Sequence, residues 1–284
     1  MPPRHRGAEQ IVGLNDKEKK LAALLRGYGS VMVAYSGGID STFLAVMAKK
    51  VLGENHLAMT AVSAIRSENE TKTARTIAKR FKLNHLVIKT DELKNKIFLS
   101  NPADRCYYCK SILWREMKKI ARAKDITTII EGSTADDLKE YRPGKAASIK
   151  CGIRSPLAEA GLTKTEIRSL AKKMGLPNWN APSNSCLATR IPYGRTIKVS
   201  ELRRIGSSET FLKKIGFGNL RVRHHGYLAR IEVPAEEIPA MIKRSSNIVK
   251  KLKGLGYKFV TLDLAGYQKG CYDDGKKNAK RKNN

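Results

Sequence analysis

This sequence lacks long apolar runs and has few acidic residues relative to its basic ones. No stretch approaches the ~18 apolar residues of a membrane span, and the start MPPRHRGAEQ lacks the apolar core of a secretory signal. We therefore expect a cytoplasmic protein. Lys and Arg number 55 against 26 Asp and Glu, a formal net charge of +29. Such a field attracts polyanions, including ATP, nucleotides and RNA, although a generally basic solvated surface explains the same count.

Several common signatures are also missing. The sequence has no G-x-x-x-x-G-K-[ST], which excludes a Walker-type kinase or GTPase loop. It has no RRM signature and no zinc-finger pair, and its basic residues are spread along the chain, except for the block KKNAKRKNN. Nucleic-acid binding therefore rests on charge alone and stays open.

The hydrophobic pattern predicts an α/β fold followed by a smaller module. Strand and helix patterns alternate through residues 30–135, which indicates a parallel sheet covered by helices on both faces. The pattern then changes to a β-rich α+β arrangement, so we predict domains at 1–190 and 191–270 and a basic tail at 271–284. In the first domain we expect a loose lead-in at 1–15, strands at 31–35, 57–62, 85–88 and 127–130, and helices at 16–26, 40–52, 68–81, 111–124 and 163–174. In the second we expect helices at 200–215 and 235–252, paired strands at 219–224 and 228–233, and a strand at 259–264.

A glycine turn between the first strand and its helix is the clearest candidate site. The segment Ser36-Gly37-Gly38-Ile39-Asp40-Ser41 follows a buried apolar run. Glycines let the backbone approach an anion, and the following helix offers unpaired N–H groups and a positive dipole end. Ser36 and Ser41 add hydroxyl donors, and Asp40 is a hard oxygen ligand suited to Mg²⁺. The sequence therefore predicts a phosphate-binding loop, rather than an ordinary strand-turn-helix bend.

Three of the five cysteines are candidate metal ligands. Cys106 and Cys109 have C-x-x-C spacing, and Cys186 is distant in the sequence. Three thiolates leave one coordination position open, as at a catalytic centre, and the open iron of an iron–sulfur cluster could hold a labile sulfide. A redox dithiol, half of a zinc site and a lone nucleophile at Cys186 remain alternatives. Cys151 and Cys271 have no chelating neighbour and are expected to be ordinary thiols.

The segment SGGIDS resembles the PP-loop of the ATP-pyrophosphatase superfamily, which includes GMP synthetase, NAD synthetase and tRNA thiolases. The resemblance implies cleavage of ATP to AMP and pyrophosphate, with the substrate adenylated in between. It also implies that Ser63 and Gly132, after the next strands, contact the adenosine. Ligands of open α/β sheets bind at the carboxyl ends of the strands, where these residues are expected.

Longer segments resemble LarE-type sulfur transferases. They are DRCYYCK, EGSTADDLKEYRPG, SPLAEAGLTKTEIRSLA, GLPNWNAPSNSCLATRIPYG and RVRHHGYLARIEV. The resemblance implies adenylation of a carboxylate on a pyridinium mononucleotide and insertion of sulfur there. It also implies that the chain assembles into a homo-oligomer, a hexamer. Some members sacrifice the sulfur of a cysteine matching Cys186, whereas others hold a [4Fe-4S] cluster on three cysteines, here Cys106, Cys109 and Cys186.

The resemblance also assigns the substrate phosphate to Arg221 and Arg223, with Arg190 as a weaker candidate. Alternation along a strand places Arg221 and Arg223 on one face, where they could clamp one phosphate. Two other functions remain open. A tRNA 2-thiolation enzyme would share the loop and the cluster and would explain the charge. A nucleotide-sensing protein without turnover would use the loop alone.

Overall fold

The computed structural model of this chain describes residues 6–138, 143–182 and 184–268, and within it the chain forms two compact units. The first unit comprises the chain up to Glu92 together with Asp104–Asn184. The second comprises Leu93–Ala103 together with the chain from Ser185 onward. The predicted basic tail at 271–284, with Cys271, lies outside the described residues.

Backbone hydrogen bonds explain why a short excursion from the first unit belongs to the second. Asn101 O accepts from Gly194 N at 2.9 Å, and Leu99 O accepts from Ile197 N at 2.8 Å. Hydrogen bonds between loops leave no periodic pattern in the sequence, so the sequence does not reveal that Leu93–Ala103 belongs to the second unit. The division therefore differs from the single boundary predicted near residue 190.

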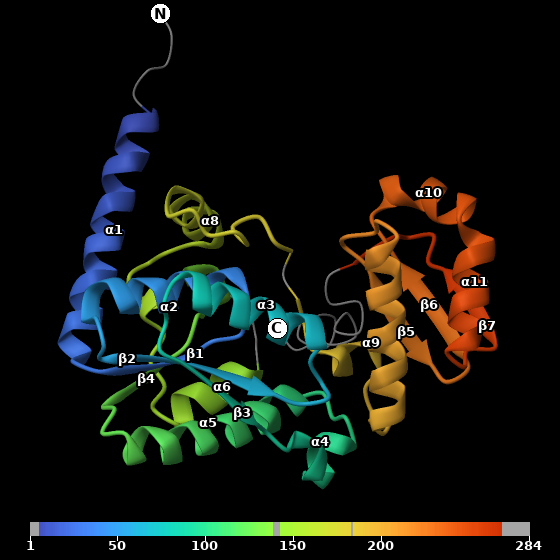
Figure 1. Cartoon of the computed structure of the whole chain (residues 1–284), viewed down its shortest axis with the longest axis horizontal. Coiled ribbons are helices and arrows are strands. Elements are labelled where there is room, and N and C mark those ends of the chain that lie inside the picture. Colours follow the sequence, from blue (N-terminus) through green and yellow to red (C-terminus); the bar gives the residue numbers. More distant parts are fainter. Residues whose placement is uncertain (1–5, 139–142, 183, 269–284) are drawn as a thin grey trace, which may run out of the picture. The chain divides into compact units, whose positions relative to one another are not determined.

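A four-stranded parallel sheet in the order β3-β2-β1-β4 forms the centre of the first unit (Figure 1). Val31 aligns with His56 on one side and with Thr128 on the other, so these strands start level with one another. All carboxyl ends therefore lie at one edge of the sheet, the edge that binds ligands in open α/β folds. The strands are β1 (Val31–Ala34), β2 (His56–Val62), β3 (His85–Lys89) and β4 (Thr128–Ile130).

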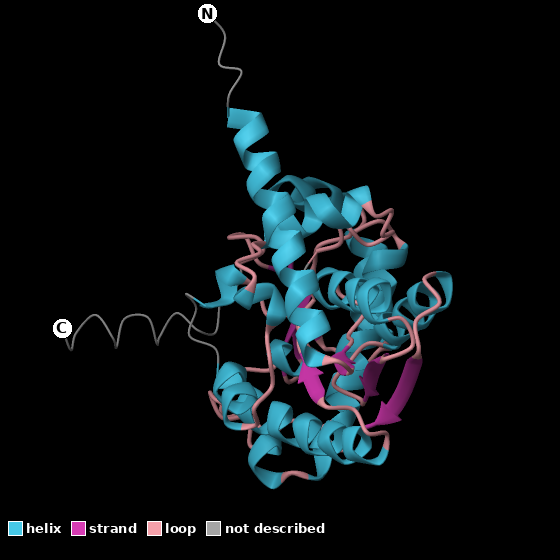
Figure 2. Ribbon diagram, turned by 90° about the vertical axis from the view of Figure 1, so that its left-hand side faces the viewer, coloured by secondary structure: helices cyan, strands magenta, loops and turns pink. Residues whose placement is uncertain are grey.

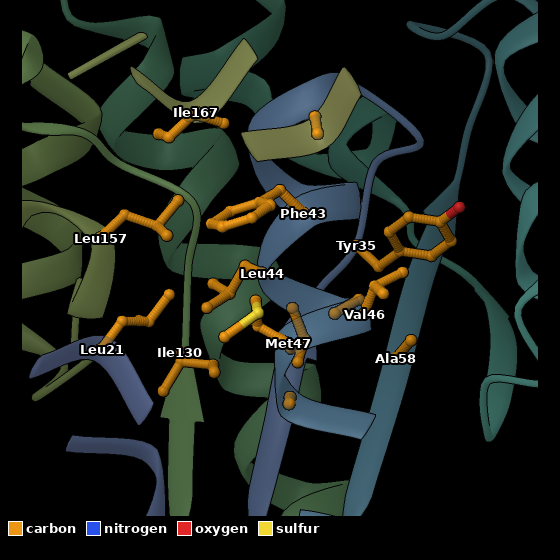
Figure 3. Packing of buried hydrophobic residues seen from close by; sticks show 14 of the residues in the cluster. Leu21, Tyr35, Phe43, Leu44, Val46, Met47, Ala58, Ile130, Leu157 and Ile167 are labelled. Atoms are coloured by element: carbon orange, nitrogen blue, oxygen red, sulfur yellow. The ribbon is translucent and has the colours of Figure 1, made fainter. Parts of the chain in front are cut away.

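Helices cover both faces of this sheet, as the alternating pattern predicts. Val33 and Ile130 face a cluster with Phe43 of α2 and Leu157 (Figure 3), whereas Met32 points the other way, into a cluster formed with α5 and α6. Successive strand residues point to opposite faces, so each strand contributes to both clusters. The helices are α1 (Arg6–Tyr28), α2 (Ile39–Leu52), α3 (Glu68–Arg80), α5 (Arg105–Ala123), α6 (Pro143–Lys150), α7 (Pro156–Glu159) and α8 (Lys164–Lys173).

The second unit is a small α+β module. Its sheet has the order β5-β6-β7, with β5 antiparallel to β6 and β6 parallel to β7. Helices pack on one side around buried residues that include Leu212, Val222, Ile231 and Leu252. In the described chain as a whole, helices are the main secondary structure and the strands are short (Figure 2). The elements are α4 (Lys96–Leu99), α9 (Val199–Lys214), β5 (Arg221–His225), β6 (Leu228–Glu232), α10 (Ile238–Lys243), α11 (Ser245–Gly254) and β7 (Phe259–Leu262).

Three predicted segments differ in the structure. The predicted lead-in at 1–15 is wrong from Arg6 onward, where α1 already begins. Helix α5 begins at Arg105 rather than at 111, so the C-x-x-C lies inside a helix. The single helix predicted at 235–252 is wrong: Ala235–Glu237 form a 3₁₀ turn, and α10 and α11 are interrupted at Arg244, whose guanidinium donates to Ile215 O.

No helix in the described ranges has both the length and the hydropathy that a membrane crossing requires.

Candidate active site

The β1–α2 turn has the geometry of an anion-binding loop. Gly37 has φ +77°, a left-handed conformation that favours glycine, and a Cβ there would lie 3.0 Å from that of Ala74. Gly38 is the N-cap of α2, and its position offers no side chain to cap the helix. The first N–H groups of α2 and its positive dipole end are therefore available to a bound anion.

Hydrogen bonds of two serine hydroxyls hold this turn in one conformation. Ser41 Oγ donates to Gly38 O at 3.0 Å and accepts from Ser36 N at 3.1 Å. Ser36 Oγ lies 3.0 Å from Ser41 Oγ and accepts from Gly38 N at 3.3 Å. Since the hydroxyls hold the loop in one shape, little ordering remains when an anion enters. Asp40 lies in the first turn of α2, beside this loop.

The ends of the neighbouring strands surround the loop. Gly132, two residues beyond β4, packs so closely on α2 that a Cβ would lie 3.0 Å from Ser41 N. Ser63 directly follows β2, and its Oγ is buried without a hydrogen-bond partner in the described chain. Parallel topology thus brings Gly132 and the phosphate loop together, and it leaves a buried hydroxyl at the end of the adjacent strand.

The C-x-x-C pair lies on the first turns of α5. Cys106 is exposed and Cys109 is half-buried, and both are thiols. The next residue, Lys110, forms an ion pair with Glu131 Oε2, and Ser133 Oγ donates to Glu131 Oε1 at 3.0 Å. Because Glu131 directly follows β4, this ion pair fastens the start of α5 to the carboxyl edge of the sheet.

Cys186 and Arg190 belong to one turn of the second unit. Cys186 is a half-buried thiol at the N-cap of the 3₁₀ helix Leu187–Arg190. Arg190 is 2% exposed and forms a two-pronged ion pair with Glu209, at 2.8 and 3.1 Å. Its remaining nitrogen donates to Ser185 O, to Cys186 O and to a hydroxyl of this turn. Arg190 therefore shapes the backbone that presents the Cys186 thiol.

Glu209 remains a carboxylate in this buried position. Burial by itself would raise its pKa, but the charge and hydrogen bonds of Arg190 and the Val222 N–H hold the pKa below its ordinary value. An ion pair of this kind is costly to break, because the remaining partner would be left buried and charged.

The two arginines predicted to clamp a phosphate are also buried. Arg223 forms a two-pronged pair with Glu232, at 2.9 and 2.8 Å, and donates to Thr189 O. Arg221 donates to Leu220 O, and its guanidinium lies 5.0 Å from the centre of the Tyr267 ring. Burial, followed by the charge of Arg190, lowers the pKa of Arg221. The arginines do occupy one face of β5, as strand alternation predicts.

Three cysteines predicted to hold a cluster are divided between the units. Cys106 and Cys109 lie in the first unit, and Cys186 lies in the second. Within the described residues no group of three or more His, Cys, Asp or Glu side chains is arranged to hold a metal ion. The cluster therefore stays a prediction. Cys151 is a half-buried thiol elsewhere in the first unit.

Sequence reasoning missed four residues that shape the site. Lys110 and Glu131 link the thiol pair to the sheet, Glu209 balances Arg190, and Asn178 donates to the phosphate loop. The signal for Glu131 was its place after an apolar strand. The other three residues had no local signal, because their partners are 19 or more residues away.

Comparison with known proteins agrees with this arrangement. Residues 17–105 match the family model described as NAD synthase. The chain is 40% identical to an uncharacterised protein of Synechocystis, over 89% of this chain and 96% of that protein. It is 34% identical to the pyridinium-3,5-bisthiocarboxylic acid mononucleotide synthase of Lactiplantibacillus plantarum, over 92% of this chain and 95% of the synthase.

A more remote similarity is restricted to part of the chain. A glutamine-hydrolysing GMP synthase component from Sulfurisphaera tokodaii is 24% identical, over 52% of this chain and 44% of that protein. The near full-length match to the Lactiplantibacillus synthase is more specific. The chain therefore belongs to the LarE family, and it is an enzyme of the PP-loop ATP-pyrophosphatase class.

Proposed function

We propose that this enzyme is an ATP-dependent sulfur transferase acting on a carboxylate of an anionic pyridinium mononucleotide. The carboxylate attacks the α-phosphorus of ATP and releases pyrophosphate. Hydrogen sulfide then attacks the acyl carbon of the adenylate, which gives a thiocarboxylate, AMP and a proton. Adenylation is needed because a carboxylate is a poor electrophile and AMP is a good leaving group. The kinship with the Lactiplantibacillus synthase supports this class of substrate.

The observation that carries the proposal is the uncapped start of α2 beside the Lys110–Glu131 pair. The loop offers N–H groups for a polyphosphate, and Asp40 in the first turn is suited to hold Mg²⁺, which offsets the charge of departing pyrophosphate. Through Glu131, the same edge of the sheet is joined to the helix that carries Cys106 and Cys109. Nucleotide activation and thiol chemistry thus meet at one strand end.

The source of sulfur forms a second part of the proposal. Cys106, Cys109 and Cys186 are the donor set for a [4Fe-4S] cluster, which when bound would supply sulfide at its open iron. Their thiols fit this role chemically: two lie three residues apart on a helix, and each of the three is at least partly accessible. Arg190 donates to Cys186 O and so helps to hold the turn that presents the Cys186 thiol.

Pyrophosphate release tests the activation step. The wild-type enzyme, given Mg-ATP, sulfide and a pyridinium dicarboxylate mononucleotide, is expected to release pyrophosphate and AMP in equal amounts. Asp40→Asn should lower the rate at least tenfold, whereas Asp125→Asn, an exposed carboxylate at a turn, should leave it unchanged. ATP binding without any pyrophosphate would instead identify a nucleotide sensor. Activity with tRNA alone would identify a tRNA thiolase.

Iron and sulfide analysis tests the cluster. After anaerobic purification, Cys106→Ala, Cys109→Ala and Cys186→Ala are each expected to lose iron and acid-labile sulfide. Cys151→Ala is the matched control, because Cys151 is also a half-buried thiol in the first unit. Unchanged iron in all three variants, or stoichiometric zinc, would reject the cluster and would leave Cys186 as the candidate sulfur donor.

A further inference from the structure

A side-chain amide from a distant loop reaches the backbone of the phosphate loop. Asn178 Nδ2 donates to Gly37 O at 2.9 Å and to Thr42 Oγ1 at 3.1 Å. Asn178 is 8% exposed, and Thr42, on α2, is fully buried. These hydrogen bonds connect residues 141 and 136 positions apart in the chain. The Asn178 amide, which belongs to neither the turn nor α2, therefore links the two by hydrogen bonds.

The bond to Gly37 O fixes the orientation of the Gly37–Gly38 peptide in the phosphate loop. In a planar trans peptide, the carbonyl of Gly37 and the N–H of Gly38 point in opposite directions. Fixing the carbonyl with Asn178 therefore fixes the N–H, which now points to Ser36 Oγ at 3.3 Å. A peptide flanked by two glycines is otherwise the most easily rotated unit of the loop.

The orientation of the amide follows from its partner. A carbonyl oxygen only accepts hydrogen bonds, so the atom of Asn178 that faces Gly37 O must be the nitrogen. Asn178 Oδ1 is buried and accepts no hydrogen bond from the described residues. A buried acceptor without a donor is destabilising. That cost is hard to explain if the residue serves stability alone, but it fits a residue that holds the loop.

The loop carrying Asn178 has a rigid base. Arg168 of α8 donates to Ala181 O at 2.8 Å and to Trp179 O at 3.2 Å. Lys172, also on α8, lies 4.8 Å from the centre of the Trp179 ring. Because α8 packs on α2 through the same hydrophobic cluster, the amide is held at a defined position against the loop.

From these contacts we infer that Asn178 is a positioning residue for ATP: it holds the Gly37–Gly38 peptide and thereby the shape of the loop that binds the polyphosphate. The inference rests on the ATP use contained in the proposed function. It assigns to the segment Leu176–Ala181 a task in nucleotide binding, although this segment lies far in sequence from the loop that binds. Asn178 acts through Gly38 and is not a catalytic group.

Paired affinities for ATP and AMP separate positioning from folding. AMP lacks the β- and γ-phosphates, so a loop with a misoriented Gly37–Gly38 peptide should weaken ATP binding selectively. By calorimetric titration, Asn178→Ala is expected to lower ATP affinity about tenfold, with AMP affinity changed less than about twofold. Asn178→Asp should be worse than Asn178→Ala, because its carboxylate would face the Gly37 carbonyl. Asn247→Ala, which changes an exposed asparagine on α11, is the matched control.

A second variant distinguishes a positioning role of Asn178 from a loss of affinity caused by misfolding. Thr42→Val keeps the side-chain shape but removes one of the two acceptors that hold the amide, so it should give a smaller loss of ATP affinity in the same direction. Equal losses for ATP and AMP, or no loss in either variant, would overturn the inference. The binding measurement needs no sulfur acceptor. If the wild-type enzyme binds ATP but transfers no sulfur, the proposed function fails while the role of Asn178 is still tested.

Discussion

Gly132 is the residue whose replacement the structure limits most clearly. Adding a methyl group would place a Cβ 3.0 Å from Ser41 N and 3.2 Å from the Asp40 carbonyl carbon. Both contacts are backbone atoms, so the loop itself would have to shift. We expect Gly132→Ala to lower ATP affinity at least tenfold, measured by titration. Gly27→Ala, where a Cβ meets nothing within 4 Å, should leave the affinity unchanged. Equal affinities in the two variants would contradict this packing.

His56 makes the amino edge of the sheet sensitive to acid. Its Nε2 accepts from Asn84 N at 3.1 Å, so Nδ1 carries the proton and donates to Gly53 O at 2.6 Å. Burial holds the pKa of His56 below its ordinary value of 6.5. The unfolded chain therefore takes up a proton first as the pH falls. The contribution of His56 to stability is complete above pH 6.5 and is lost as the pH falls through the lower pKa of the folded state.

Urea unfolding checks this pH dependence. The midpoint for the wild-type protein should be lower at about pH 5.5 than at about pH 7.5. His56→Gln, which does not titrate in this range, should be less stable at the higher pH but should show a smaller difference between the two. An unchanged difference would assign the acid sensitivity to the other buried histidines, such as His224.

At the scale of elements, α8 shows how a local sequence signal sets a helix end. Thr163 Oγ1 accepts from Glu166 N at 3.3 Å, and Glu166 Oε2 accepts from Thr163 N at 2.9 Å. This is the capping box that the spacing predicts. Thr163→Ala should cost about 1 kcal/mol of unfolding free energy, measured by denaturant titration. Thr165→Ala, on an exposed position of the same helix, should be neutral or slightly stabilising.

Helix α5 shows where local signals are insufficient. Its first turns, RCYYCKS, are polar and aromatic rather than amphipathic, so periodicity alone starts the helix at 111 instead of Arg105. The tertiary contacts of Lys110 with Glu131 and with the Trp114 ring stabilise these turns. The consequence reaches the site, because Cys106 and Cys109 are displayed from a helix and not from a flexible turn.

At the scale of the whole molecule, each unit has its own hydrophobic cluster. The clusters of the first unit enclose its parallel sheet, whereas Leu252 and its neighbours enclose the sheet β5-β6-β7. Mg-ATP is expected to stabilise the unit that contains the phosphate loop. Calorimetry should therefore show two transitions, only one of which rises with Mg-ATP.

A core substitution in the second unit provides the complementary change. Leu252 is fully buried, so Leu252→Ala should cost ~2–5 kcal/mol and lower the transition that Mg-ATP leaves unchanged. Leu264→Ala is the control, because Leu264 is 83% exposed and its truncation should change stability by less than about 0.5 kcal/mol. A single transition displaced by both ATP and Leu252→Ala would show that the units unfold together.

The sequence by itself determined the alternation of strands and helices in the first unit, the glycine turn with its hydroxyls, and the family. These features depend on residues close together in the chain, where apolar spacing, glycine conformation and capping act directly. Only the tertiary structure decided that Gly132 packs on Ser41, that Asn178 holds the Gly37 carbonyl and that Arg190 is neutralised by Glu209. Such contacts join residues brought together by folding, and their energies depend on burial and on partner geometry, which no local pattern encodes.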